Sequence, residues 1–383
     1  MPTAAPHIAI LSPFLRGNKG HGGITPWVIN VANGLAARGA KVELLVNAKA
    51  KTPLQHSQLS PGITIINLGR RKLLALWALL KYLKRSHPDA LLTAGHRYNA
   101  MGCWAKRFTT TPVYLSVHEN LSASSQTLSE TKRRRRQRQV AKSFARCDGV
   151  IAVSQGVADD LIAQGLPAGR CTVIHNPIIN DTLLEKAQQG ADHPWLHDGQ
   201  APLLIAVGRL EAQKDYPTLI RALSTVLQQR PNTRLIILGE GSYRNELTRL
   251  IGELGLQAVV EMPGHVANPM AYMAAADLFV LSSAWEGFGN VLVEALAVGT
   301  PVVATDCPSG PSEILADGQY GPLVPVGDSA ALADAIIQTL DKPLSAEQLK
   351  QRSRAFSVDA AVGRYYQTLL SKTSPGLAEP RAC

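Results

Sequence analysis

The chain has 383 residues, of which 45% are hydrophobic and 18% are charged, a globular composition that excludes a disordered chain. No apolar run reaches the roughly 20 residues that a membrane span needs, and the amino-terminal residues lack the basic and apolar regions of a signal peptide. The five cysteines are scattered and form no CxxC pair, which argues against a disulfide framework or a zinc site. We therefore expect a cytoplasmic protein.

The net charge of +10 is unevenly distributed. Residues 1–177 hold 24 of the 39 Lys and Arg residues but only 7 of the 29 Asp and Glu residues, whereas the remaining residues hold 15 and 22. Such a concentration of basic residues usually indicates that one half meets a polyanion, which could be nucleic acid, anionic lipid or an acidic substrate.

Short apolar runs that predict strands alternate with helical periodicity along the whole chain. In the first half, strands are predicted at residues 7–12, 41–46, 113–117, 149–153 and 171–174, and helices at 25–38, 73–85 and 130–146. In the second half, strands are predicted at residues 203–207, 234–238, 259–262, 278–281 and 302–304, again alternating with helices. Nearly continuous apolar strands separated by helices predict parallel sheets covered on both faces. The expected fold is α/β, with two Rossmann-like, doubly wound domains facing across a cleft.

A polar, irregular stretch separates the two predicted domains. We expect a first domain at residues 1–177, a linker at 178–200 and a second domain at 201–356, with a last helix at about 357–372 that could pack back on the first domain. Ligands of open α/β sheets bind outside the carboxyl ends of the strands, so binding motifs should directly follow strands.

The most informative motif follows the strand at 278–281. Glu286 stands in a loop, Gly287 to Gly289 read Gly-Phe-Gly, and a helix starts at Asn290 with Glu294 about one turn inside it. The spacing lets Glu286 face a sugar and Glu294 accept hydrogen bonds from a ribose diol, while glycines let backbone N–H groups approach a phosphate. Two solvated surface glutamates are the simpler alternative, but the order strand, glycine loop, helix favours binding.

A second motif, with Arg209 and Lys214, follows the strand at 203–207. A diphosphate leaving group develops negative charge, which Arg209 could bind bidentately and Lys214 as a point charge. No Asp-x-Asp cluster stands in a suitable loop, so we expect no metal and no cofactor beyond the co-substrate.

Two weaker signals lie in the first half. The Gly22-Gly23 loop precedes the first helix and could bring backbone amides to a phosphate, although a flexible loop is an equal alternative. His118 ends the strand at 113–117 with Glu119 beside it, and could contact the transferred sugar or orient an acceptor; a structural histidine is the alternative.

Together these motifs resemble the retaining glycosyltransferases of family 4. The resemblance rests on Glu286 and Glu294, the Gly208 to Asp215 block, Gly239-Glu-Gly241, Pro263 to Val266, the Ala297 to Val303 segment, and the Gly22-Gly23 loop. It implies a GT-B fold, with the donor held by the second domain and the acceptor by the first.

Carried over residue by residue, the resemblance implies a nucleotide-sugar site. Arg209 and Lys214 would bind the diphosphate, Glu294 the ribose, and His265 and Val266 the base. Glu286 and the following backbone would bind the sugar. The full set of predicted binding residues is Gly22, Gly23, Arg209, Lys214, Gly241, His265, Val266, Glu286, Gly287, Phe288, Gly289, Asn290, Val291 and Glu294, with Glu286, His118, Arg209 and Lys214 as the catalytic residues.

The family also implies retention of the anomeric configuration. We find no carboxylate placed as a nucleophile, so we expect front-face departure in which a donor phosphate oxygen takes the acceptor proton. The loop from Asp306 to Glu313 resembles the version common in bacterial enzymes that build lipid-linked or surface glycans.

Two basic segments suggest which polyanion the first half meets. Cations cover most of the helix predicted within residues 132–146, and a second basic helix at 70–85 is more amphipathic, with its apolar side expected to pack inside. Since each Lys or Arg near an anionic leaflet can contribute about 1 kcal/mol, we predict peripheral docking on the cytoplasmic membrane through Lys132 to Arg146. A solvated charged face is the alternative.

The expected function is transfer of a sugar from a UDP-hexose or a UDP-N-acetylhexosamine to a hydroxyl of a membrane-associated glycan or lipid-linked acceptor in bacterial surface-glycan synthesis. GDP-mannose stays open as a donor. The alternatives are a GT-B enzyme with a small soluble acceptor, a nucleotide-sugar epimerase, or a basic nucleic-acid-binding module; aromatic residues total only 5%, and no recognition helix or aromatic stacking arrangement supports the last.

Overall fold

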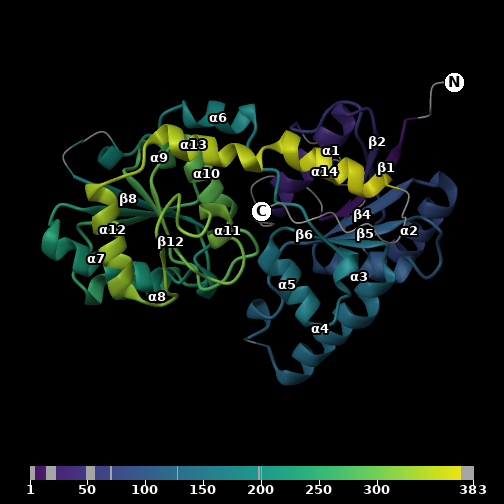
Figure 1. The fold of residues 1–383 in the computed structure, drawn as a ribbon, viewed down its shortest axis with the longest axis horizontal. Coiled ribbons are helices and arrows are strands. Elements are labelled where there is room, and N and C mark those ends of the chain that lie inside the picture. Colours follow the sequence, from purple (N-terminus) through teal and green to yellow (C-terminus); the bar gives the residue numbers. More distant parts are fainter. Residues whose placement is uncertain are drawn as a thin grey trace. The chain divides into compact units, whose positions relative to one another are not determined.

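The computed structural model describes residues 5–13, 23–48, 57–69, 71–126, 128–196, 199 and 201–371 of the chain. The chain divides into two compact units (Figure 1): unit 1 comprises residues 1–177 and 358–383, and unit 2 comprises residues 178–357. Each unit contains one parallel sheet with helices packed against it, which confirms the predicted α/β class.

Unit 1 contains a seven-stranded parallel sheet in the order β3-β2-β1-β4-β5-β6-β7. Its strands are β1 (His7–Ser12), β2 (Lys41–Val46), β3 (Thr64–Asn67), β4 (Ala90–Ala94), β5 (Val113–Val117), β6 (Gly149–Ala152) and β7 (Cys171–Val173). Its helices are α1 (Ile24–Ala37), α2 (Lys72–Ser86), α3 (His96–Ala105), α4 (Glu130–Ser143), α5 (Gln155–Ala163) and α14 (Val358–Leu370). All residues of β4 and β5 are buried, as expected for central strands covered on both faces.

The last helix, α14, packs on α1 within unit 1 (Figure 1). Trp27, Val31 and Leu35 recur every four residues along α1 and are all buried, so they form the stripe that faces the core. Gly34 lies on the side toward α14, where a Cβ would stand 2.6 Å from Cγ2 of Val362. A larger residue than glycine would therefore push the two helices apart.

Unit 2 repeats the arrangement with six parallel strands in the order β10-β9-β8-β11-β12-β13. Its strands are β8 (Leu203–Val207), β9 (Arg234–Leu238), β10 (Val260–Gly264), β11 (Leu278–Leu281), β12 (Val302–Thr305) and β13 (Leu323–Val324). Its helices are α6 (Asp181–Ala187), α7 (Tyr216–Gln229), α8 (Arg244–Glu253), α9 (Pro269–Ala275), α10 (Asn290–Val298), α11 (Pro311–Leu315), α12 (Ser329–Asp341) and α13 (Ala346–Ser353). The segment expected as a linker thus contains α6.

The structure adds three strands to those expected from the sequence: β3, β4 and β13. The addition of β4 matters most, because β4 lies beside β1 at the point where the strand order of unit 1 reverses. Gly95 and His96 follow its last residue, Ala94, so a second histidine besides His118 stands directly after a central strand of this unit.

The expectation that the apolar side of α2 packs inside holds only for part of the helix. Leu79 and Leu83 are buried, but Leu73, Leu74 and Trp77 are 72%, 58% and 68% exposed. None of the helices in the described part of the chain is long and apolar enough to cross a membrane.

Candidate active site

Five strands of unit 2 carry the predicted motifs at one edge of the sheet. Arg209 follows β8, Gly241 follows β9, His265 follows β10 and Glu286 follows β11. The loop at 306–313 follows β12. Because parallel strands share a carboxyl edge, all these segments lie at the same edge, and β8 and β11 are the neighbours at which the strand order reverses.

Glycine geometry shapes the loop between β11 and α10. Gly289 has a φ of 98° and stands directly before α10, so a residue with a Cβ would be strained there. Gly310 has a φ of 104°, and a Cβ on it would lie 1.8 Å from the carbonyl oxygen of Phe288. The backbone N–H of Glu286 also donates to the carbonyl of Pro308, at 3.2 Å. The loop at 306–313 therefore packs directly against the Glu286 loop.

Lys214 and Glu286 form the central ion pair of the site. Nζ of Lys214 lies 2.5 Å from Oε1 of Glu286, and the two side chains are 13% and 8% exposed. The same Oε1 accepts a hydrogen bond from the hydroxyl of Ser283 at 2.7 Å. The carboxylate that was expected to face the sugar is thus held by an ammonium group and a buried serine.

Gln213 links this pair to Arg209. Its Nε2 donates to the carbonyl of Trp285 at 2.9 Å and to Oε2 of Glu286 at 3.4 Å, while its Oε1 accepts from Nη2 of Arg209 at 3.4 Å. Arg209 itself is exposed. The structure therefore brings Arg209, Lys214 and Glu286 into one network, in which Gln213 and Ser283 were not identified from the sequence.

Glu294 is half-buried in the second turn of α10. Burial raises its pKa to about 7, while the positive charges of Lys214 and Lys186 partly oppose this shift. The influence of Lys214 on this pKa places Glu294 in the same electrostatic environment as the ion pair. Phe288, Gly287 and Gly289 are buried between Glu286 and α10, and Asn290 and Val291 begin the helix half-buried.

Gly241, which follows β9, and the predicted base-binding residues His265 and Val266, which follow β10, have different surroundings. A Cβ on Gly241 would lie 2.2 Å from the carbonyl oxygen of Leu210, so this glycine is required where the loops after β8 and β9 approach each other. His265 is exposed and Val266 is half-buried after the edge strand β10. No contact within the described residues joins either of them to Lys214 or Glu286.

In unit 1 the described part of the predicted site is centred on His118. Gly22 lies outside the described residues, and Gly23 is exposed and caps the start of α1. His118 is half-buried, and burial lowers its pKa to about 3, so its imidazole is neutral. Nε2 of His118 lies 2.9 Å from Oγ of Ser116, and its ring packs against the Trp27 ring at an interplanar angle of 80° and a centroid distance of 4.7 Å. The sequence did not single out Trp27 or Ser116.

No group of three or more His, Cys, Asp or Glu side chains within the described residues is arranged to hold a metal ion.

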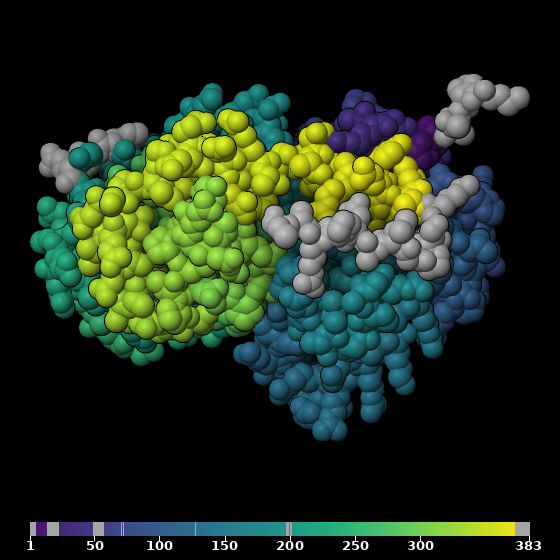
Figure 2. Space-filling model, in the orientation of Figure 1, coloured from purple at the N-terminus to yellow at the C-terminus, as the bar shows by residue number. Residues whose placement is uncertain are grey.

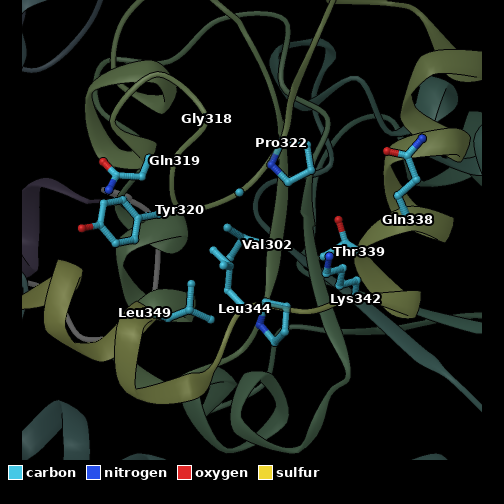
Figure 3. A pocket seen from close by; sticks show the side chains of 12 residues that line it. Val302, Gly318, Gln319, Tyr320, Pro322, Gln338, Thr339, Lys342, Leu344 and Leu349 are labelled. Atoms are coloured by element: carbon cyan, nitrogen blue, oxygen red, sulfur yellow. The ribbon is translucent and has the colours of Figure 1, made fainter.

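A separate hollow of about 320 Å³ lies in unit 2 (Figure 3). It is lined by Val302 at the start of β12, by Tyr320 and by Leu344. This is the amino-terminal edge of the sheet, opposite the Glu286 loop, whereas ligands of parallel α/β sheets bind at the carboxyl edge. We therefore assign the hollow no part in the candidate active site.

Known structures share the fold of the described chain. The sucrose-phosphate synthase of Thermosynechococcus elongatus superimposes with a TM-score of 0.80 at 24% identity, covering 96% of this chain and 100% of that one. The Anabaena protein HepE, solved in complex with UDP-glucose, superimposes with a TM-score of 0.75 at 23% identity, covering 95% and 99%. The two sheets and these neighbours define a GT-B fold.

Sequence comparison gives the family. Residues 21–181 match the family described as Glycosyltransferase Family 4, and residues 190–356 match Glycosyl transferases group 1. The phosphatidyl-myo-inositol mannosyltransferase of Mycobacterium leprae is 31% identical over 355 residues, which cover 90% of this chain and 89% of that protein. The chain belongs to glycosyltransferase family 4, and it is a transferase enzyme, as the motifs predicted.

Other relatives match over shorter segments. The N-acetylgalactosamine-N,N'-diacetylbacillosaminyl-diphospho-undecaprenol 4-alpha-N-acetylgalactosaminyltransferase of Campylobacter jejuni is 33% identical over 56% of this chain and 58% of its own length. The lipopolysaccharide core biosynthesis glycosyltransferase LpsE of Rhizobium meliloti is 35% identical over 45% of this chain and 51% of its own length. The matched segments thus span about half the length of these two relatives, which act in lipid-linked glycan and lipopolysaccharide synthesis.

Proposed function

We propose that this enzyme transfers a sugar from a UDP-sugar, with retention of configuration, to a hydroxyl group of a lipid-linked or membrane-associated glycan. The observation that carries the proposal is the grouping of Arg209, Lys214 and Glu286, with Glu294 nearby, at the strand-order reversal of unit 2. Binding of UDP and UDP-glucose by HepE supports a UDP-sugar donor. The acceptors named for the Campylobacter and Mycobacterium relatives support a lipid-linked acceptor.

In this proposal Arg209 and Lys214 bind the diphosphate. Two cations stabilise the negative charge that develops on the leaving group, so no metal ion is required for that role. The guanidinium of Arg209 is exposed and donates to Gln213 only at 3.4 Å, so little has to be broken before it binds a phosphate. The ammonium of Lys214 would share its charge between the diphosphate and Glu286.

The surroundings of Glu286 favour front-face departure over double displacement. Its carboxylate accepts hydrogen bonds from Lys214, Ser283 and Gln213, and each of these stabilises the charge that a nucleophile would have to share with the sugar. We propose that Glu286 orients a sugar hydroxyl and that the donor phosphate oxygen takes the acceptor proton. Glu294 would accept the ribose hydroxyl hydrogen bonds.

Product analysis tests this function directly. Purified protein is incubated with UDP-glucose, UDP-N-acetylglucosamine or GDP-mannose, with and without a polyprenyl-diphosphate-linked glycan, and release of the nucleoside diphosphate is measured. Release that depends on the lipid-linked glycan is expected. Equal release with a short soluble sugar would favour the soluble-acceptor alternative, and a change of sugar identity without release would indicate an epimerase.

We also propose that unit 1 docks on the inner face of the cytoplasmic membrane. Seven of the eight cations from Lys132 to Arg146 are exposed, and α4, which carries most of them, lies at the lower edge of unit 1 with long side chains extending into solvent (Figure 2). Arg136 is the exception, since it pairs with Glu119 at 2.6 Å and donates to Ser124 and Ser125. The exposed Leu73, Leu74 and Trp77 of α2 would add apolar contacts with the lipid.

Vesicle flotation tests the docking proposal. Wild-type protein should float with vesicles containing phosphatidylglycerol and stay unbound with phosphatidylcholine alone. Replacing Lys132, Arg133, Arg134 and Arg135 by Gln should abolish flotation, whereas Arg249→Gln, an exposed cation of unit 2, should not change it. Unchanged flotation of the fourfold variant would refute the role of α4.

A further inference from the structure

The hydroxyl group of Tyr216 is buried in unit 2 and has no hydrogen-bond partner within the described residues. Tyr216 is the first residue of α7, two positions after Lys214, and it is 3% exposed. Its ring lies in the hydrophobic core of unit 2 with Leu210 and Leu219. A phenylalanine ring would fill the same position without burying an oxygen, and a buried polar group without a partner is destabilising. Core packing therefore does not account for this hydroxyl.

The hydroxyl lies beside the side chain of Lys214. A Cβ on Gly208, directly after β8, would stand 2.9 Å from the hydroxyl oxygen of Tyr216 and 2.8 Å from Cε of Lys214. The two atoms thus approach the same point of the backbone, and Nζ is one bond beyond Cε. Rotation about the last bonds of the lysine side chain can therefore bring the ammonium group toward the hydroxyl. Burial raises the pKa of Tyr216, and so does the charge of Glu286, so the phenol stays uncharged.

The backbone of the Lys214 turn is fixed on the loop that follows β11. The hydroxyl of Ser282 donates to the carbonyl oxygen of Lys214 at 2.8 Å, and the backbone N–H of Ala284 donates to the carbonyl oxygen of Gln213 at 2.8 Å. On the other side of the turn, the ring of Tyr216 is held in the core. Because both flanks are held, the ammonium group of Lys214 moves by rotation of its own side chain while the turn stays in place.

We propose that Tyr216 is a positioning residue for Lys214, whose ammonium group donates to the Tyr216 hydroxyl oxygen when the donor diphosphate binds. This inference rests on the proposed function, in which Lys214 binds the diphosphate. An ammonium group has three N–H donors. One already reaches Oε1 of Glu286 at 2.5 Å, a second would bind a diphosphate oxygen, and the third would bind Tyr216. Three contacts in different directions hold the point charge of a flexible lysine in one place.

Tyr216→Phe tests the inference, because it keeps the ring and removes only the oxygen. The variant should unfold at or above the wild-type Tm, since it loses a buried hydroxyl that has no partner. Calorimetric titration should nevertheless show UDP binding weakened about tenfold, the scale of one hydrogen bond to a charged group. Tyr320→Phe, whose ring is half-buried at the opposite edge of the sheet, is the matched control and should change neither quantity.

A double-mutant cycle shows whether the hydroxyl acts through Lys214. Lys214→Met should weaken UDP binding, and adding Tyr216→Phe should weaken it by less than about twofold more, because the partner of the hydroxyl is already gone. Additive losses would overturn the positioning role. If Tyr216→Phe binds UDP as tightly as the wild type while Lys214→Met does not, the inference fails and the proposed function stands. If Lys214→Met binds as the wild type does, the diphosphate site is refuted and the inference with it.

The transfer assay separates positioning from a loss of folded protein. With the UDP-sugar as the varied substrate, Tyr216→Phe should raise the donor KM and lower kcat/KM by about tenfold, because a misplaced ammonium group binds the diphosphate less well. Loss of folded protein would instead lower kcat in proportion and leave KM unchanged. A lower Tm together with an unchanged donor KM would show that the hydroxyl is merely structural and would overturn the proposal.

Discussion

Replacing Lys214 by methionine should separate the structural role of the ion pair from its role in binding. The substitution leaves the carboxylate of Glu286, 8% exposed, without its cation. Breaking a fully buried pair costs about 3–5 kcal/mol. Because Ser283 and Gln213 still donate to the carboxylate and the pair is partly exposed, we expect a loss of about 2 kcal/mol here. For a unit of this size, that corresponds to a fall of about 4–8 °C in Tm.

The assay is thermal unfolding with and without UDP, on a double-mutant cycle. Lys214→Met/Glu286→Gln removes both charges and should recover to within about 1 kcal/mol of the wild-type protein, so the two sites should couple by at least about 1 kcal/mol. UDP at 100 times its Kd should stabilise the wild type by about 2.7 kcal/mol. Both variants that lack Lys214 should lose most of that stabilisation.

The control is Lys342→Met, an exposed lysine at the opposite edge of the same sheet, which should change neither quantity. Full stabilisation of the double variant by UDP would refute the assignment of Lys214 to the diphosphate. An unchanged Tm in the single variant would refute the structural role of the ion pair.

Three further predictions concern the same unit. Arg209→Ala should weaken UDP binding at least tenfold yet change Tm by less than about 2 °C, because the side chain is exposed; calorimetric titration and unfolding of the same sample check this. The pKa of Glu294 is raised from 4.5 to about 7, so the folded unit holds a proton that the unfolded chain releases, and unit 2 should lose stability as the pH rises from 4.5 to 7. Glu294→Gln should remove that loss, and unfolding curves that differ from wild type by the same amount at pH 4 and pH 8 would contradict the raised pKa. Gly310→Ala should destabilise unit 2 by more than about 2 kcal/mol and abolish transfer, because its Cβ would overlap the carbonyl of Phe288, whereas Gly327→Ala, with a positive φ but no atom within 4 Å, should cost only about 1 kcal/mol; circular dichroism melts compare the two.

Many strand positions were predictable from local residue patterns. The bounds of β1, β2, β5, β8, β9 and β11 agree with the runs identified in the sequence, because each is a nearly continuous apolar segment between polar or turn-forming residues. The pattern missed β4 because Ala-Leu-Leu-Thr-Ala is short and rich in alanine, which suits a helix equally well. It missed β3 because Thr-Ile-Ile-Asn contains only two apolar residues, too short a run to stand out in the sequence.

The sequence by itself determined the α/β class, the family and the motifs that follow each strand, since these depend on residues adjacent in the chain. Only the tertiary structure decided that Lys214 meets Glu286 across 72 positions, that Gln213 links them to Arg209, and that Arg136 pairs with Glu119 instead of facing solvent. It also decided that Tyr365 reaches Trp27 across 338 positions. The physical reason is that periodicity reports which side of an element is buried, whereas the partner found on that side depends on strand order and on how closely helices such as α1 and α14 pack.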